Sequence, residues 1–227
     1  SVTVEKLLNR QAGLPGIGVL YGPPGRGKSM AAGAMVVAYR AYYIQVAKAW
    51  GVKTLLQKIL LEMGAVIPKR VRSTSDLLDL VTLQLAASRR PLILDEADRL
   101  TGKEAMIETV RDIYEQSRAP ILLVGSEDLR TELRAYPTTH SRVHAWVSAQ
   151  PVTFDDAQKL ATVYASGIRI APDLLAEIVD RLGGSVRYTC VNLARVLDEA
   201  LVMGDDEMNL AKWGSRPIYN DDTEGEA

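Results

Sequence analysis

Short apolar runs alternate with longer stretches of helical periodicity over the first 150 residues. This alternation is typical of a parallel β-sheet covered by helices. The apolar runs predict strands at residues 17–21, 41–46, 91–95 and 120–124, with a weaker one at 144–152. The periodic stretches predict helices at residues 28–39, 52–63, 75–89, 103–117 and 127–135, and Ser75 is the expected cap of the third.

The pattern changes at Thr153, which forms a helix-capping pattern with Asp156. Three helices with no strand between them are predicted at residues 154–166, 173–182 and 186–203. The last residues are polar and acidic, which predicts disorder. We therefore expect an α/β core over residues 1–152, a small helical lid over 153–213 and a disordered acidic tail over 214–227.

Composition and charge narrow the class of protein. With 47% hydrophobic residues the chain can bury a full core. Lys plus Arg number 27 against 28 for Asp plus Glu, so any contact with DNA must come from a local patch. The single cysteine, Cys190, lies in a helical apolar pattern and is expected to be a buried thiol in a reducing compartment. No signal peptide or membrane span is visible, so we expect a protein of the cytoplasm, in a bacterial or phage-infected cell, with no membrane contact.

The most informative motif is Gly-Pro-Pro-Gly-Arg-Gly-Lys-Ser at residues 22–29, a complete G-x-x-x-x-G-K-S phosphate-binding loop after the first predicted strand. Backbone N–H groups of such a loop surround the phosphates of ATP, and the helix that follows directs its positive end at them. Lys28 is predicted to contact the β- and γ-phosphates and Ser29 to ligate Mg²⁺. Nucleotide contacts are expected from Gly22, Pro23, Pro24, Gly25, Arg26, Gly27, Lys28, Ser29 and Met30.

A second motif, Pro-Leu-Ile-Leu-Asp-Glu-Ala-Asp at residues 91–98, is a short buried run that ends in adjacent carboxylates. It has the form of a Walker B element. Asp95 is predicted to hold Mg²⁺, and Glu96 to polarise the attacking water, which favours hydrolysis over binding alone. The sequence Asp-Glu-Ala-Asp also occurs in DEAD-box helicases. Those proteins need a second RecA-like domain that closes on the nucleotide, and 227 residues cannot supply two such domains together with the helical C-terminal segment. We treat that match as coincidence.

An α/β nucleotide core followed by a helical lid resembles an AAA+ P-loop NTPase, and three further residues fit that resemblance. Ser126, at the end of the run 120–126, falls at the sensor 1 position, where many members carry Asn or Thr. Arg142 falls in the segment that carries the arginine finger, which stabilises charge on the phosphoryl group of a neighbouring subunit. Arg187, after Gly184, falls at the sensor 2 position. An ordinary surface arginine stays the alternative for both arginines.

Within that superfamily the chain resembles the transposition regulators of the Mu-type phage B protein, TnsC and TniB family. The resemblance lies in residues 43–64, 123–126, 141–142 and 151–157, and extends diffusely over residues 5–205. It implies an ATPase that assembles as a filament or ring on duplex DNA, regulates target selection and responds to a transposase. The B protein carries an N-terminal helix-turn-helix domain, whereas none precedes Leu14 here, so we expect a shortened chain or a core-only relative.

A DNA-binding patch would be local, and the cluster Lys69, Arg70 and Arg72 is the best candidate. Lys53 and Lys103, at predicted helix starts, are expected to join it. Such side chains would contact phosphates without reading sequence. Solvated surface remains the ordinary alternative for a short basic run.

Two other functions stay open. One is a different AAA+ machine, such as a helicase loader or initiator, or a secretion-associated ATPase with a protein partner. The other is a small-molecule kinase, whose phosphate loop would look the same, although the adjacent carboxylates Asp95 and Glu96 favour water activation. Stimulation of ATP hydrolysis by duplex DNA would separate these possibilities.

Overall fold

The computed structural model describes residues 5–7, 9–11, 13–69, 71 and 73–220. The chain divides into two compact units. The first comprises residues 1–23 and 28–149, and the second comprises residues 24–27 and 150–227. The middle four residues of the phosphate-binding loop, 24–27, therefore group with the second unit, while its two ends, residues 22–23 and 28–29, belong to the first.

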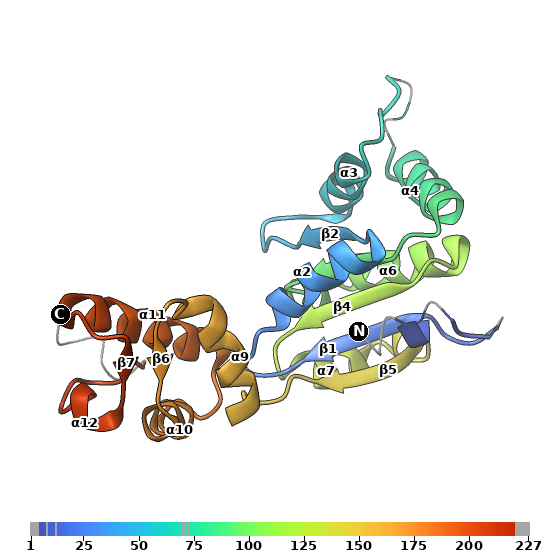
Figure 1. Cartoon of the computed structure of the whole chain (residues 1–227). Helices are drawn as coiled ribbons and strands as arrows, with labels where there is room; N and C mark the ends of the chain where they lie inside the picture. Colours follow the sequence, from blue (N-terminus) through green and yellow to red (C-terminus); the bar gives the residue numbers. More distant parts are fainter. Residues whose placement is uncertain (1–4, 8, 12, 70, 72, 221–227) are drawn as a thin grey trace. The chain divides into compact units, whose positions relative to one another are not determined.

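The first unit is built on a five-stranded parallel sheet in the order β2-β3-β4-β1-β5 (Figure 1). The strands are β1 (Ile17–Tyr21), β2 (Tyr42–Gln45), β3 (Leu92–Asp95), β4 (Ile121–Gly125) and β5 (Val143–Ser148). Strand β3 is buried along its whole length. Because all strands are parallel, their carboxyl ends meet at one edge, where α/β proteins bind their ligands.

Helices cover both faces of this sheet. They are α2 (Lys28–Tyr39), α3 (Val52–Glu62), α4 (Thr74–Ser88) and α6 (Glu104–Ser117), with short α5 (Asp98–Thr101), α7 (Leu129–Glu132), η1 (Leu133–Ala135) and α8 (Pro137–His140) between them. Helix α2 packs Ala32 and Met35 on one face, against Ile93 and Val124. Helices α3, α4 and α6 pack on the other face, in the larger core. Successive side chains of each strand point to opposite faces of the sheet, so alternate residues belong to the two different cores.

The second unit is mainly helical. It contains α9 (Phe154–Tyr164), α10 (Pro172–Arg181), α11 (Val186–Met203) and α12 (Leu210–Trp213), with a two-stranded parallel sheet of β6 (Arg169–Ile170) and β7 (Glu207–Met208). Trp213 and Ile218 are buried with Leu174, Ile178 and Val196. Thr153 caps α9: its hydroxyl accepts a hydrogen bond from Asp156 N–H, and the Asp156 carboxylate accepts one from Thr153 N–H.

The parallel sheet and its flanking helices confirm the predicted fold class. Several details of the prediction are wrong. The cap of α4 is Ser73, whose hydroxyl accepts from Asp76 N–H, and not Ser75. Strand β5 ends at Ser148, ahead of Pro151, whose ring nitrogen cannot donate to a ladder. The stretch 127–135 forms α7 and a 3₁₀ turn, not one helix.

The second unit also differs from its prediction. Strand β6 lies between α9 and α10, where no strand was expected, and pairs with β7 from beyond α11. Strands of two residues are too short to show a period in sequence. Residues 214–220, expected to be disordered, include the buried Ile218, while residues 221–227 lie outside the described part of the chain. In the described part, none of the helices has the length and apolar character needed to cross a bilayer.

Candidate nucleotide-binding site

The phosphate-binding loop connects β1 to the first residue of α2. Gly25 and Gly27 have φ angles of +76° and +73°, which L-residues with a side chain rarely adopt. A Cβ on Gly25 would also lie 2.7 Å from the Ser185 hydroxyl oxygen. Glycine is thus required at this position by both conformation and space. The carbonyl of Gly25 accepts a hydrogen bond from Arg187 N–H at 3.1 Å, within the second unit.

Lys28 folds over the beginning of its own loop. Its ammonium donates to the carbonyl oxygens of Gly22 and Pro23, both at 2.7 Å. An ammonium has three N–H donors, so one remains for a phosphate oxygen. Burial lowers the pKa of Lys28, and four carboxylates oppose that shift, in decreasing order Asp98, Asp95, Glu96 and Glu127. The predicted phosphate contact therefore lies in a strongly acidic neighbourhood within the first unit.

Asp95 occupies the carboxyl end of β3, and only 3% of its surface is exposed. Its Oδ1 accepts a hydrogen bond from Glu96 N–H at 2.8 Å, and its Oδ2 accepts one from the Tyr43 hydroxyl at 2.6 Å. Burial, followed by this hydrogen bond, raises the pKa of Tyr43, so the hydroxyl keeps its proton. Two internal donors therefore fix the orientation of the carboxylate.

Glu96 has an unusual backbone conformation, with a φ of +58°. Such strain in a non-glycine residue is found preferentially at functional sites. The Glu96 carboxylate lies 3.4 Å from the Arg99 guanidinium, and Arg99 also donates to the carbonyl of Val46 at 2.8 Å. The pair is about 40% exposed on each side, so it orients Glu96 more than it stabilises the fold.

Ser126, the predicted sensor, is bound to Asp98. Its hydroxyl donates to Asp98 Oδ1 at 2.6 Å, and its N–H donates to Oδ2 at 2.9 Å. The hydroxyl proton is therefore directed at a carboxylate, and only a lone pair of the oxygen is left for another partner. Asp98 links the Walker B turn to the end of β4.

Arg142, the predicted finger, forms an ion pair through its Nε with Glu115 of α6. Its Nη1 also donates to the Ser141 hydroxyl at 3.1 Å. The hydrogen bond that Arg142 Nε donates to Glu115 is the largest cause that lowers the pKa of Glu115. The guanidinium remains 42% exposed, so part of it is accessible to a second molecule.

The other predicted contacts lie at the loop, at the start of α2 or in the second unit. Arg26 Nη1 donates to the Gly184 carbonyl at 3.0 Å, within the second unit. Arg187 is exposed on the first turn of α11, while its backbone N–H binds Gly25. In the first unit, Ser29 is the second residue of α2 and Met30 is 52% exposed.

The residues present suit a magnesium ion. Among the described residues, no set of three or more His, Cys, Asp or Glu side chains is placed to hold a metal ion alone. Mg²⁺ prefers oxygen ligands and usually keeps waters, taking one or two protein ligands and the phosphates of a nucleotide. A Ser29 hydroxyl and an oriented Asp95 carboxylate match that demand.

The predicted DNA-contacting residues fall into two places. Lys103 donates to the carbonyls of Lys48 and Trp50, at 2.7 and 2.6 Å, so it fixes the loop that leads into α3. Lys53 is exposed in the first turn of α3. Lys69 is exposed beyond the other end of that helix, whose 11 residues span about 16 Å. Arg70 and Arg72 lie outside the described residues.

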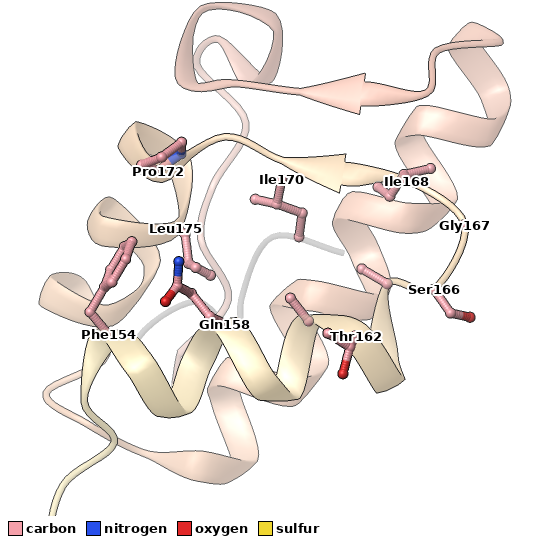
Figure 2. Close-up of a pocket in the computed structure, with 11 residues that line it drawn as sticks. Phe154, Gln158, Thr162, Ser166, Gly167, Ile168, Ile170, Pro172 and Leu175 are labelled. Atoms are coloured by element: carbon pink, nitrogen blue, oxygen red, sulfur yellow. The ribbon is translucent and has the colours of Figure 1, made fainter.

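A hollow of about 430 Å³ lies in the second unit, between α9, β6 and the start of α10 (Figure 2). Figure 2 shows Gln158 and Thr162 of α9 on one side, with Ile170 and Leu175 facing them. None of its lining residues was predicted to bind nucleotide, metal or DNA.

The sequence matches a known family over more than half of its length. Residues 11–133 match the profile of a family described as "AAA domain". The chain belongs to the AAA domain family. Among curated proteins, none matches the chain in sequence.

Solved structures with the same fold agree with this membership. The ORC2 protein of Aeropyrum pernix, described as ADPNP-ADP complexes, has a TM-score of 0.70 at 20% identity, covering 93% of this chain and 64% of that one. Cdc6p of Pyrobaculum aerophilum has a TM-score of 0.63 at 19% identity, covering 89% and 60%. RuvB of Thermotoga maritima, described as a Holliday junction branch migration motor, has a TM-score of 0.60 at 19% identity, covering 93% and 63%. The chain thus spans less than two thirds of each of these structures, and the fold is that of an AAA+ P-loop NTPase.

Sequence reasoning missed Tyr43, Asp98 and Arg99 as parts of this site. Asp98 offered one signal, its position three residues after Asp95 in the acidic run. Tyr43 offered none, because an aromatic residue in a buried strand reads as core. Its role becomes visible only when β2 and β3 are placed side by side.

Proposed function

We propose that this AAA domain is an ATP-dependent, Mg²⁺-requiring ATPase that assembles on duplex DNA without sequence preference and regulates target selection in DNA transposition. The observation that carries the ATPase part is the gathering of Asp95, Glu96 and Asp98 around Lys28 at the carboxyl edge of the sheet. The transposition part rests on the resemblance to the Mu-type B protein, TnsC and TniB family.

In the proposed hydrolysis each residue has a separate role. Lys28 would donate to a phosphate oxygen, and Ser29 and Asp95 would hold the metal. A bound Mg²⁺ ion would supply charge neutralisation on the phosphates. Glu96, kept in place by Arg99, accepts the proton of the attacking water. The acidic surroundings of Lys28 suit a site that must attract a divalent cation together with the nucleotide.

Two hydrogen bonds connect the predicted lid to the phosphate-binding loop. Arg26 donates to the carbonyl of Gly184, and the N–H of Arg187 donates to the carbonyl of Gly25. A phosphate that changes the conformation of the loop at these residues would shift both hydrogen bonds. Arg187 lies in the first turn of α11 and would contribute the sensor 2 contact. Ser126 acts through Asp98 rather than by a direct hydroxyl donation, since its proton is already directed there.

Assembly brings the arginine finger into use. Arg142 pairs with Glu115 in a single chain, and that pair must open or turn for the guanidinium to reach a neighbour's phosphate. A surface ion pair of this exposure contributes at most about 1 kcal/mol, so a phosphate can compete for it. Hydrolysis would then depend on subunit association.

DNA contact is proposed for the basic residues around the loop between β2 and α3. Lys103 fixes that loop, and Lys48, Lys53 and Lys58 are exposed on or after it. Lys58 also lies over the Trp50 ring, 5.9 Å from its centroid. These cations would contact phosphates, and a single subunit with a net charge of −1 would bind weakly. Assembly would let the contacts add.

A second candidate is an initiator or helicase-loading ATPase, favoured by the fold shared with ORC2 and Cdc6p. The two share ATP-dependent DNA binding and differ in the partner protein. Steady-state ATP hydrolysis with and without long duplex DNA tests the proposal. Stimulation by DNA supports both DNA-directed candidates, and further stimulation by a transposase supports the first. Hydrolysis indifferent to DNA points to a protein-directed ATPase.

A further inference from the structure

Tyr43 and Asp95 come together because of how β2 pairs with β3. In the parallel register Tyr43 lies opposite Ile93, and Gln45 lies opposite Asp95. Side chains two residues apart in a strand share a face, so Asp95 is on the same face as Ile93. Ile93 belongs to the core under α2, and Tyr43 packs against that core. The Tyr43 ring thus lies on the face of the sheet where α2 carries Ser29.

The hydrogen bond from the Tyr43 hydroxyl to Asp95 Oδ2 is short, at 2.6 Å, and its acceptor is a carboxylate that is 3% exposed. The other oxygen is held by Glu96 N–H. A carboxylate oxygen offers about two lone-pair positions, so each oxygen keeps one for a further donor. The two internal bonds select which pair of positions is presented.

We propose that Tyr43 is a positioning residue that orients the Asp95 carboxylate toward a water of the Mg²⁺–nucleotide complex. The inference rests on the proposed function, since it concerns the same metal site. Tyr43 neither ligates the metal nor contacts the phosphates in this role. Its hydroxyl donates to Asp95 and leaves the outward lone pairs of the carboxylate to the metal-bound water.

Tyr43→Phe isolates the hydroxyl because it keeps the ring that packs against α2. Loss of a hydrogen bond that orients a metal-binding group typically weakens metal affinity or activity 10- to 100-fold. We expect a fluorescent ADP analogue to bind Tyr43→Phe roughly 10-fold more weakly than wild type in the presence of Mg²⁺. In EDTA the two proteins should bind it equally, because Lys28 and the loop backbone are unchanged. Mn²⁺ bound to the ADP complex, followed by electron paramagnetic resonance, should show the same loss.

Tyr39→Phe is the matched control. The Tyr39 hydroxyl donates to Glu5 Oε1 at 3.1 Å, and its ring packs against the same core as Tyr43. The control therefore removes an equivalent hydroxyl without touching Asp95. It should behave like wild type in Mg²⁺ and in EDTA.

Three results would overturn the inference. Equal Mg²⁺-dependent affinity in wild type and Tyr43→Phe means that the hydroxyl does not position Asp95. An equal loss in Mg²⁺ and EDTA, whether from misfolding or from a damaged loop, assigns Tyr43 a structural role alone. Nucleotide binding by wild type that ignores Mg²⁺ removes the metal site itself, and with it the proposed ATPase function.

Discussion

The Asp98 carboxylate accepts two hydrogen bonds from Ser126, one from the backbone N–H and one from the hydroxyl. This pair joins the turn after β3 to the end of β4, two neighbouring strands of the sheet. A Cβ on Gly125 would come within 2.6 Å of Asp98 Oδ2, so the approach also requires the glycine that precedes Ser126. Strands β3 and β4 are thereby tied at the edge where the nucleotide is proposed to bind.

Breaking this pair from its two sides should give different results. Asp98→Ala leaves both the N–H and the hydroxyl of Ser126 without an acceptor, which should cost about 1–3 kcal/mol of stability. Ser126→Ala keeps the backbone bond and should cost less. In the double variant the two losses should not add, since they concern one contact. Urea unfolding of the four proteins measures this, and strictly additive losses would show that the residues act independently.

Lys28 and Glu96 should separate binding from turnover. Lys28→Ala removes the phosphate contact and should lose nucleotide binding. Glu96→Gln keeps the shape and the nucleotide but cannot accept the water's proton, so hydrolysis should fall by roughly 10²–10⁴-fold. The Gln variant should also accumulate an ATP-bound assembly. Equal nucleotide affinity of wild type and Lys28→Ala, measured by calorimetry, would contradict the site assignment.

Arg142 should act on a neighbouring subunit. Arg142→Ala is expected to bind ATP nearly as wild type does, yet to hydrolyse it slowly. Mixing it with Lys28→Ala should restore part of the hydrolysis, because the intact fingers of the second variant serve the intact nucleotide sites of the first. The measurement is ATPase rate against mixing ratio, with co-assembly verified independently. No recovery of ATP hydrolysis at any mixing ratio would show that Arg142 does not act in catalysis on a neighbouring subunit.

Arg142 should also affect how the stability of the fold depends on pH in the acid range. Its guanidinium lowers the pKa of Glu115 below the usual value of 4.5, so the folded state holds this proton less tightly than the unfolded state. The resulting stability is present above about pH 4.5 and is lost as the pH falls through the lowered pKa. Both side chains are partly exposed, which limits the effect to about 1 kcal/mol or less. Stability curves of wild type and Arg142→Ala should therefore converge in acid, whereas a constant offset would contradict this origin.

The sequence was most informative where a local pattern carries the chemistry. Helix α2 spans the predicted residues 28–39, and the Walker B run ends at Asp95 at the carboxyl end of β3 as expected. Thr153 and Asp156 form the predicted capping box, because that signal needs only four consecutive residues.

The sequence was least informative where distant residues meet. The Tyr43–Asp95 contact spans 52 positions, and the pairing of β6 with β7 joins segments on both sides of α11. The hydrophobic periodicity of either segment does not predict such pairings. The same holds for Arg142 and Glu115, since a single charged residue on a helix has many possible partners. Packing decides these contacts, and packing is a property of the whole sheet.

The central claim is that ATP drives assembly of this AAA domain on duplex DNA. Its most direct test is the binding of long duplex DNA to the protein with ATP, with ADP and without nucleotide, as protein concentration and salt are varied. We predict cooperative binding that requires ATP, is equal for duplexes of unrelated sequence, weakens steeply with salt and is absent in Lys28→Ala. Lys53→Ala with Lys58→Ala should weaken it without changing ATP affinity. An ATP-loaded protein that does not bind duplex DNA at low salt, or binds it equally well without nucleotide, would contradict the account.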